Sequence, residues 1–200
     1  MRPNRSIIGM TCVGLSVAVS VSLSVVATSA SAAIINVDIV GKVGVGLLPG
    51  NENHGVTNGG SGGEIGAGIT FDDVSKLLTL NFGWGSGNGF TNLTGGASMG
   101  HIHGITPSPA PASFFENTGV TIGLNMLPGW NNNFSNGGFS GTVALNAAQE
   151  AALLSGSLYL NIHTNVNPAG EIRGNLVIPE PTTMLAIASM GALILRRKRA

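Results

Sequence analysis

The sequence predicts an all-β domain, a Greek-key β-sandwich with one short helix, and two observations support this. Apolar residues alternate with small or polar ones, as in half-buried strands; Leu78, Leu80, Phe82 and Trp84 form one such run. Clusters of Gly, Asn and Pro separate these runs, which is typical of turns between antiparallel strands. The predicted strands are Ile34–Val40, Glu64–Asp72, Leu77–Trp84, Met99–Ile105, Val120–Met126, Phe139–Leu145, Leu158–His163 and Glu171–Ile178.

One segment favours a helix. Asn146 can cap its first turn, and Gln149 stands three residues later, at the capping-box position. The span 147–155 is rich in helix-forming residues, and Gly156 can end the helix in a left-handed turn. The sequence therefore predicts a single short crossover helix between strands.

Two segments rich in Gly and Asn, Pro49–Gly63 and Pro128–Gly138, are predicted to be mobile loops. His54 in the first loop is expected to be solvated. Trp130 in the second is the candidate for stacking on a ligand such as a sugar, whereas Trp84 is predicted to belong to the core.

The N-terminus has the features of a signal peptide, predicted to cover residues 1–32. Two arginines precede the apolar stretch Ile7–Val26, and a small-residue cleavage site follows, with Ala30 and Ala32 at its key positions. An uncleaved anchor is the alternative. Cleavage by signal peptidase would remove Cys12, the one cysteine, so disulfides and thiol catalysis are excluded from the mature chain.

The C-terminal segment, residues 179–200, combines a short motif, a short apolar helix and a basic end. Pro179, Glu180 and Pro181 keep the chain extended and accessible. The run Thr182–Leu195 is 14 residues, and as a helix it spans about 21 Å of a hydrocarbon core of roughly 30 Å. The basic residues that would hold the end on the cytoplasmic side are Arg196, Arg197, Lys198 and Arg199.

This order of features resembles the PEP-CTERM sorting signal of Gram-negative bacteria. The resemblance implies a transient intermediate in the inner membrane, cleavage by an exosortase-type membrane protease, and delivery to the cell surface or extracellular matrix. An ordinary C-terminal membrane anchor with a chance Pro-Glu-Pro is the alternative.

Between these ends, residues 33–178 make up one domain, long enough to bury a core. It contains three basic residues against eight acidic ones, a net charge of −5. No basic patch is present in this sequence, so nucleic acid is excluded as a partner.

Three motifs of this domain resemble the CHRD family. They are His101-Ile102-His103-Gly104, the segment from Ala151 to Thr164, and Asn167-Pro168-Ala169-Gly170-Glu171-Ile172-Arg173-Gly174. The resemblance implies an immunoglobulin-like or related β architecture and, in bacteria, no established catalytic role. The Gly/Asn-rich insert Asn51–Gly63 departs from the family pattern of an acidic residue followed by prolines. The residues that carry the structural motif are Gly104, Asn161, Gly170, Arg173 and Gly174.

The histidines in these motifs also have a direct physical interpretation. His101 and His103 are two residues apart and so share one face of a strand. If Thr164–Gly170 is a hairpin connection, His163 comes close to the next strand, which carries Glu171 and Arg173. The three imidazoles are a reasonable ligand set for Zn or Cu, with Glu171 as an orienting residue or fourth ligand.

Two alternatives remain open at this point. In the first, the histidines bond to backbone groups and Glu171 pairs with Arg173 in a purely structural network. In the second, the His-x-His motif and the stretch 167–178 resemble copper–zinc superoxide dismutases. That resemblance fails at the zinc-ligand loop, because no second histidine cluster follows His103 and there is no cysteine pair.

These observations predict an exported, non-enzymatic protein of the bacterial cell surface or extracellular matrix, with exopolysaccharide or matrix proteins as partners. The alternative is a Zn- or Cu-binding β-sandwich with superoxide dismutase-like activity.

Overall fold

The computed structural model describes residues 33–56 and 58–179. The predicted signal peptide, with Ala30 and Ala32, lies outside the described residues, as does the sorting tail from Glu180 onward. Within the described residues, none of the helices has the length and apolar character needed to cross a membrane.

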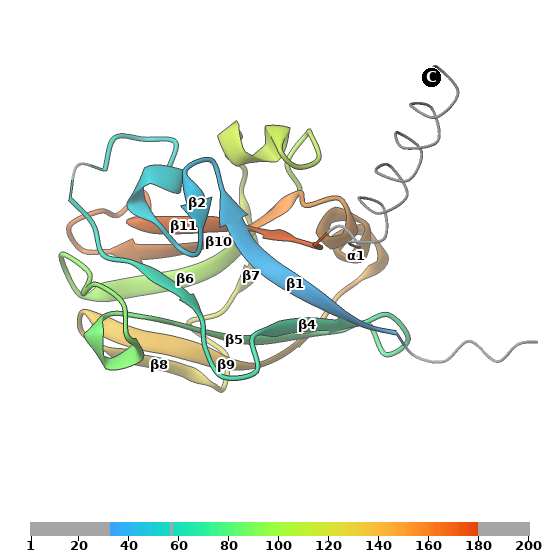
Figure 1. Cartoon of the computed structure of the whole chain (residues 1–200), viewed down its shortest axis with the longest axis horizontal. Helices are drawn as coiled ribbons and strands as arrows, with labels where there is room; N and C mark the ends of the chain where they lie inside the picture. Colours follow the sequence, from blue (N-terminus) through green and yellow to red (C-terminus); the bar gives the residue numbers. More distant parts are fainter. Residues whose placement is uncertain (1–32, 57, 180–200) are drawn as a thin grey trace, which may run out of the picture. The chain divides into compact units, whose positions relative to one another are not determined.

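The strands form one antiparallel sheet that curls into two facing layers (Figure 1). Its order is β7-β6-β10-β11-β1-β4-β5-β9-β8, with β2 paired to β1 and β3 paired to β5. The bounds are β1 Ile34–Gly41, β2 Gly44–Val45, β3 Gly62–Glu64, β4 Ile69–Asp72, β5 Leu77–Trp84, β6 Ala97–His103, β7 Val120–Gly123, β8 Trp130–Asn133, β9 Asn136–Ala144, β10 Leu158–Thr164 and β11 Ile172–Val177.

Strand β1 connects the two layers. Its first half pairs with β4, with Val37 opposite Ile69, and its second half pairs with β11, with Ile39 opposite Leu176. The sheet therefore turns at β1, and the structure confirms a mostly β, sandwich-like domain.

The core lies between the layers and follows the alternation in the sequence. Leu78, Leu80, Phe82 and Trp84 of β5 are all fully buried, as is Ile102 of β6 from the facing layer. Burying one such side chain contributes about 1.5–3 kcal/mol.

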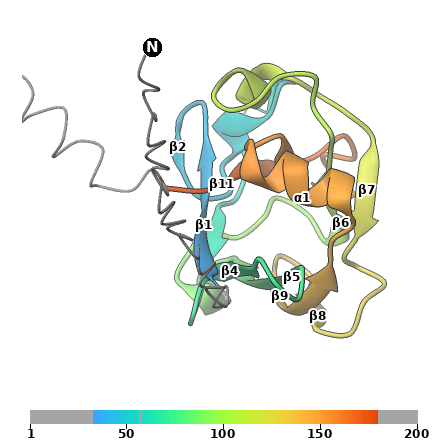
Figure 2. The same ribbon diagram turned by 90° about the vertical axis from the view of Figure 1, so that its right-hand side faces the viewer.

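The predicted helix is confirmed as α1, Ala147–Leu154, at one end of the sandwich (Figure 2). The Gln149 amide donates to the Asn146 side chain, and the Asn146 amide donates to the Gln149 side chain, each at 2.9 Å. Gly156 follows with a φ of 70°, the left-handed conformation expected at this end.

The single strand predicted at Glu64–Asp72 is wrong. Strand β3 ends at Glu64, a turn follows, and β4 begins at Ile69. Gly66 and Gly68 have φ values of 57° and 71°, which reverse the chain direction. The alternation of apolar residues continued through this turn and concealed it.

The two predicted loops also contain regular structure. Residues 128–138 include strand β8 and the start of β9, which form a hairpin. Residues 49–63 include the 3₁₀ helix η1, Pro49–Asn51, and strand β3. The buried Asn51 side chain accepts from the Val43 amide at 3.0 Å and donates to the Arg173 carbonyl at 2.9 Å, tying this segment to β11.

Candidate metal centre

The candidate site lies on the outer face of strands β6, β10 and β11. Tyr159 of β10 is opposite His103 of β6, and Asn161 is opposite both His101 of β6 and Arg173 of β11. The register therefore places these polar side chains together on the face that points away from the apolar core.

Two segments from elsewhere in the chain cover this face. Residues 49–56 and 105–119 lie on the side of β10 and β11 away from β5 and β9 (Figure 1, Figure 2). As a result His103, His163, Asn161 and Arg173 are buried although they are polar. Burial of polar groups is unfavourable unless each one finds a partner.

The structure brings His101, His103 and His163 together. The Nδ1 atom of His101 lies 3.3 Å from Nε2 of His163, and Nε2 of His103 lies 3.4 Å from the same His163 atom. One nitrogen from each ring falls within a group of atoms no more than 4.8 Å apart. His101 is partly exposed, whereas the other two are buried.

The hydrogen bonds at the opposite side of two rings fix which nitrogen carries the proton. The Nδ1 atoms of His103 and His163 lie 2.9 Å from the backbone carbonyls of Thr118 and Pro168, respectively. A carbonyl oxygen only accepts, so each Nδ1 carries hydrogen and each Nε2 presents a bare lone pair. Two lone pairs therefore face each other at 3.4 Å.

The hydrogen on Nδ1 of His101 cannot donate to the Nε2 lone pairs of both His103 and His163. If Nδ1 of His101 donates to Nε2 of His163, the lone pair of His103 still faces an acceptor. A metal ion between the rings would bind all three nitrogens, and the carbonyl bonds at Nδ1 are the usual way in which metal-binding imidazoles are oriented.

Two of the three separations between the ligand nitrogens fit such an ion, and the third is at most 4.8 Å. Zinc–nitrogen bonds of about 2.0–2.1 Å at a tetrahedral angle separate two ligand nitrogens by about 3.3–3.4 Å. The two separations measured from His163 Nε2 are 3.3 Å and 3.4 Å.

All three rings are held in the neutral form that metal binding requires. Burial, together with His163 and His103, lowers the pKa of His101 to about 4. Burial is also the main cause that lowers the pKa of His103 and of His163.

Glu171 is fully buried but belongs to a different network and is not among the three grouped ligands. Its carboxylate accepts hydrogen bonds from the amides of Gly60 and Thr94 and from the hydroxyls of Thr94 and Thr164. Burial by itself raises the pKa of Glu171, but these hydrogen bonds outweigh it, and the net shift is downward. Glu171 thus holds three loops together as an ionised acceptor.

The structural alternative is found in part: His103 and His163 bond to backbone carbonyls, but Glu171 and Arg173 form no ion pair among the described residues. Arg173 donates to the Asn117 side chain at 2.8 Å and to the Glu116 carbonyl at 2.8 Å, on the covering segment. Its guanidinium carbon lies 3.6 Å from the centre of the Tyr159 ring. That ring in turn stacks on His103, with centroids 4.9 Å apart and planes 9° apart. Arg173 therefore stabilises the aromatic support of one candidate ligand.

The glycines of the structural motif allow close packing around the site. A Cβ atom on Gly104 would overlap the Leu158 side chain, and one on Gly174 would overlap Ile39. Gly170 has a φ of 128°, and a Cβ there would lie 2.5 Å from both the Glu52 and Asn161 side-chain oxygens.

Two residues of the covering segment 49–56 differ from expectation: Glu52 was not among the candidate residues, and His54 is not simply solvated. Nε2 of His54 lies 2.9 Å from the Gly170 carbonyl, and its Nδ1 lies 3.5 Å from Glu52, so this histidine is bonded to the domain rather than simply solvated. Burial raises the pKa of Glu52 to about 7, against the opposing effects of Arg173 and Lys42. The departure from the family pattern at Asn51–Gly63 was the one signal that pointed to this segment.

Two buried oxygens near Gly170 have no hydrogen-bond partner among the described residues. They are Oε1 of Glu52 and Oδ1 of Asn161. The carboxylate of ionised Glu52 and the amide oxygen of Asn161 only accept hydrogen bonds. Burial raises the pKa of Glu52, and the Asn161 side chain is among the groups that oppose this shift.

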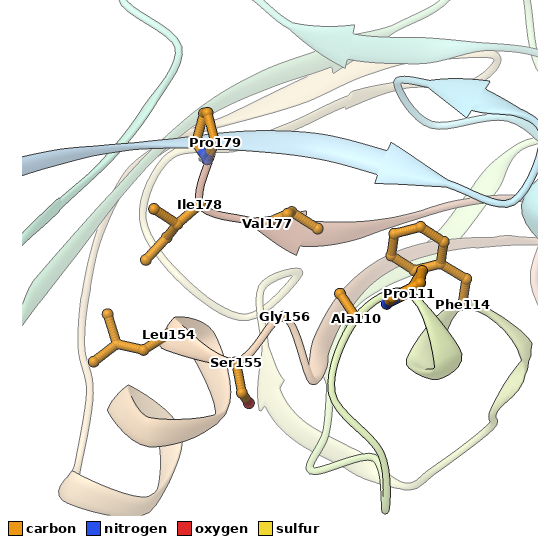
Figure 3. Close-up of a pocket in the computed structure, with 9 residues that line it drawn as sticks. All are labelled: Ala110, Pro111, Phe114, Leu154, Ser155, Gly156, Val177, Ile178 and Pro179. Atoms are coloured by element: carbon orange, nitrogen blue, oxygen red, sulfur yellow. The ribbon is translucent and has the colours of Figure 1, made fainter. Parts of the chain in front are cut away.

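The remaining candidate residues lie away from the histidines. Trp130 belongs to strand β8 rather than to a loop, and its half-buried ring lies 5.0 Å from that of Trp84, so only part of it is free to stack on a ligand. Pro179, the first residue of the Pro-Glu-Pro motif, lines a pocket of about 470 Å³ with Phe114 and Leu154 (Figure 3). Glu180, Pro181 and the basic end lie outside the described residues.

The fold and the site define a sandwich-like all-β domain with a covered polar face and a cluster of three neutral imidazoles. The family model for the CHRD domain matches residues 44–176, and the chain belongs to this family. No curated protein and no solved structure matches the chain.

Proposed function

We propose that this CHRD domain binds one transition-metal ion, Zn or Cu, through His101, His103 and His163, and that it acts without catalytic turnover. The observation that carries the proposal is the pair of bare Nε2 lone pairs of His103 and His163, 3.4 Å apart. Their Nδ1 atoms already donate to backbone carbonyls, so a change of tautomer that moves hydrogen to Nε2 would break one of these hydrogen bonds.

Metal analysis tests the proposal on the chain purified with a tag that contains no histidine. The wild-type protein should bind one equivalent of metal after dialysis. His101→Ala should lose that equivalent and should still fold, because His101 is the partly exposed member of the cluster. His54→Ala is the matched control and should bind metal as the wild type does.

Two outcomes would contradict the proposal. One is a wild-type protein that holds well under one equivalent of either metal. The other is an identical loss of metal in His54→Ala and His101→Ala. Superoxide assays on the loaded protein separate a binding domain from a dismutase, and robust turnover would favour the enzyme.

We also propose that the chain is exported from a Gram-negative cell. In this proposal signal peptidase cleaves after Ala32, an exosortase-type protease cleaves at Pro179-Glu180-Pro181, and the inner membrane holds the tail only transiently. The mature immunoglobulin-like domain then acts at the surface or in the extracellular matrix, in contact with exopolysaccharide or matrix proteins.

Intact mass spectrometry of protein recovered from the host tests both cleavages. The expected mass begins at Ala33 and lacks the apolar run and basic end. Deletion of the Pro-Glu-Pro motif should retain the tail in the membrane fraction, and unchanged release of the deletion variant would contradict processing at this motif.

A further inference from the structure

The strand that carries two of the histidines presents a third potential ligand on the same face. Along β6 the residues Gly100 and Ile102 face the core: Ile102 is fully buried, and a Cβ on Gly100 would overlap the Trp130 ring. The alternation of a strand therefore places Met99, His101 and His103 together on the opposite, outer face.

The pairing of β6 with β10 places Met99 directly opposite His163. Side chains of directly opposed residues on one face have Cβ atoms about 4.5–5.5 Å apart. The flexible Met99 side chain can therefore extend its sulfur toward His163, whose Nε2 atom is near a nitrogen of each of the other two rings. The Met99 side chain is 39 % exposed, so it is not fixed by packing in the core.

We propose that Met99 supplies the fourth ligand and that the site is selective for copper(I). This inference rests on the proposed metal-binding function and specifies its metal. A thioether is a soft donor that favours Cu(I), whereas zinc sites use imidazole, thiolate and carboxylate ligands.

The charges around the three histidines also favour copper(I). Three neutral imidazoles and a thioether contribute no negative charge. Among the described residues, no carboxylate joins the three-histidine group, since Glu171 is held by the loop network. Arg173 adds a positive charge nearby, because its guanidinium carbon lies 3.6 Å from the centre of the Tyr159 ring, which stacks on His103. A monovalent ion leaves less uncompensated charge in this partly buried site than a divalent ion does.

The Met99→Leu variant tests the proposal, because leucine retains the apolar bulk and removes the sulfur. Met126→Leu is the matched control, since Met126 is 83 % exposed and follows β7. Affinities are measured by competition, with a Cu(I) chelator under anaerobic reducing conditions and with a Zn(II) chelator. X-ray absorption of the copper-loaded wild type reports whether sulfur is bound.

The expected result is a sulfur ligand in the wild type and a loss of Cu(I) affinity on the order of tenfold or more in Met99→Leu. The Zn(II) affinity of Met99→Leu and both affinities of Met126→Leu should stay at the wild-type values. A wild-type spectrum with only nitrogen ligands, or equal Cu(I) affinities for Met99→Leu and wild type, would overturn the inference while leaving metal binding intact. A wild-type protein that binds neither metal would overturn the proposed function and this inference together.

Discussion

Replacing Glu52 with glutamine should stabilise the domain at neutral and alkaline pH but have little effect under acidic conditions. The carboxyl is buried, its Oε1 has no partner among the described residues, and burial raises its pKa from 4.5 to about 7. Because the folded-state pKa lies above the unfolded value, the folded state retains a proton that the unfolded chain releases. The stabilising contribution of this proton to the free energy of unfolding is therefore fully present below pH 4.5 and is lost as the pH rises to 7.

The size of the effect follows from that shift. Each pKa unit corresponds to about 1.4 kcal/mol, so the change from 4.5 to about 7 corresponds to roughly 3 kcal/mol. Glutamine has no proton to lose and stays uncharged across this pH range. The difference in unfolding free energy between Glu52→Gln and wild type should therefore grow between pH 4.5 and 7 and then level off.

Urea unfolding followed by circular dichroism from pH 4 to 9 measures this difference. The lowered pKa values of the three histidines destabilise the fold as the pH falls below 6.5, in wild type and variant alike. Comparing the variant with wild type at each pH cancels this shared effect. Glu150→Gln is the control, because its partly exposed pair with Lys76 should contribute no more than about 1 kcal/mol. A constant difference in unfolding free energy between Glu52→Gln and wild type across the whole pH range would contradict this prediction.

Three further predictions concern the packing, the helix and the metal. Gly170→Ala should lower the free energy of unfolding by about 2 kcal/mol or more, because its positive φ strains alanine and the Cβ would meet Glu52 and Asn161; Gly119→Ala, where a Cβ meets open space, is the control, and equal denaturation midpoints would contradict the expectation. Asn146→Ala should cost about 1 kcal/mol in thermal or urea unfolding, since it removes the capping box, and no change would mean that the cap is dispensable. Metal affinity should decline as the pH falls from 6.5 towards 4, where protons compete for the lowered-pKa histidines such as His101; a decline that begins above pH 7 in a chelator competition would show that the rings are not held neutral.

Much of the fold could be predicted because its determinants are local. The alternation in Leu77–Trp84 gave strand β5 with its exact bounds, and the capping pattern gave α1 to within one residue. The break at Gly66 and Gly68 was missed, because the apolar pattern continues through the turn.

The candidate site was predictable only in part. His101 and His103 share a face because they are two apart on a strand, and the hairpin from β10 to β11 places Arg173 opposite Asn161 rather than opposite His163. The partners of Glu171 and Arg173 were not predictable, since Thr94 and Asn117 lie 77 and 56 residues away in sequence. Contacts over such separations leave no periodic signal.

A mostly β domain with one helix, and histidines placed in a few short motifs, follow from the spacing of residues along the chain. The contact of His163 with both other rings, their orientation by the Thr118 and Pro168 carbonyls, and the position of Met99 opposite His163 depend on the three-dimensional fold. Strand register and the two covering segments are set by packing across the whole domain, so residue spacing alone does not specify them. Burial beneath those segments then sets the pKa values on which the proposed chemistry depends.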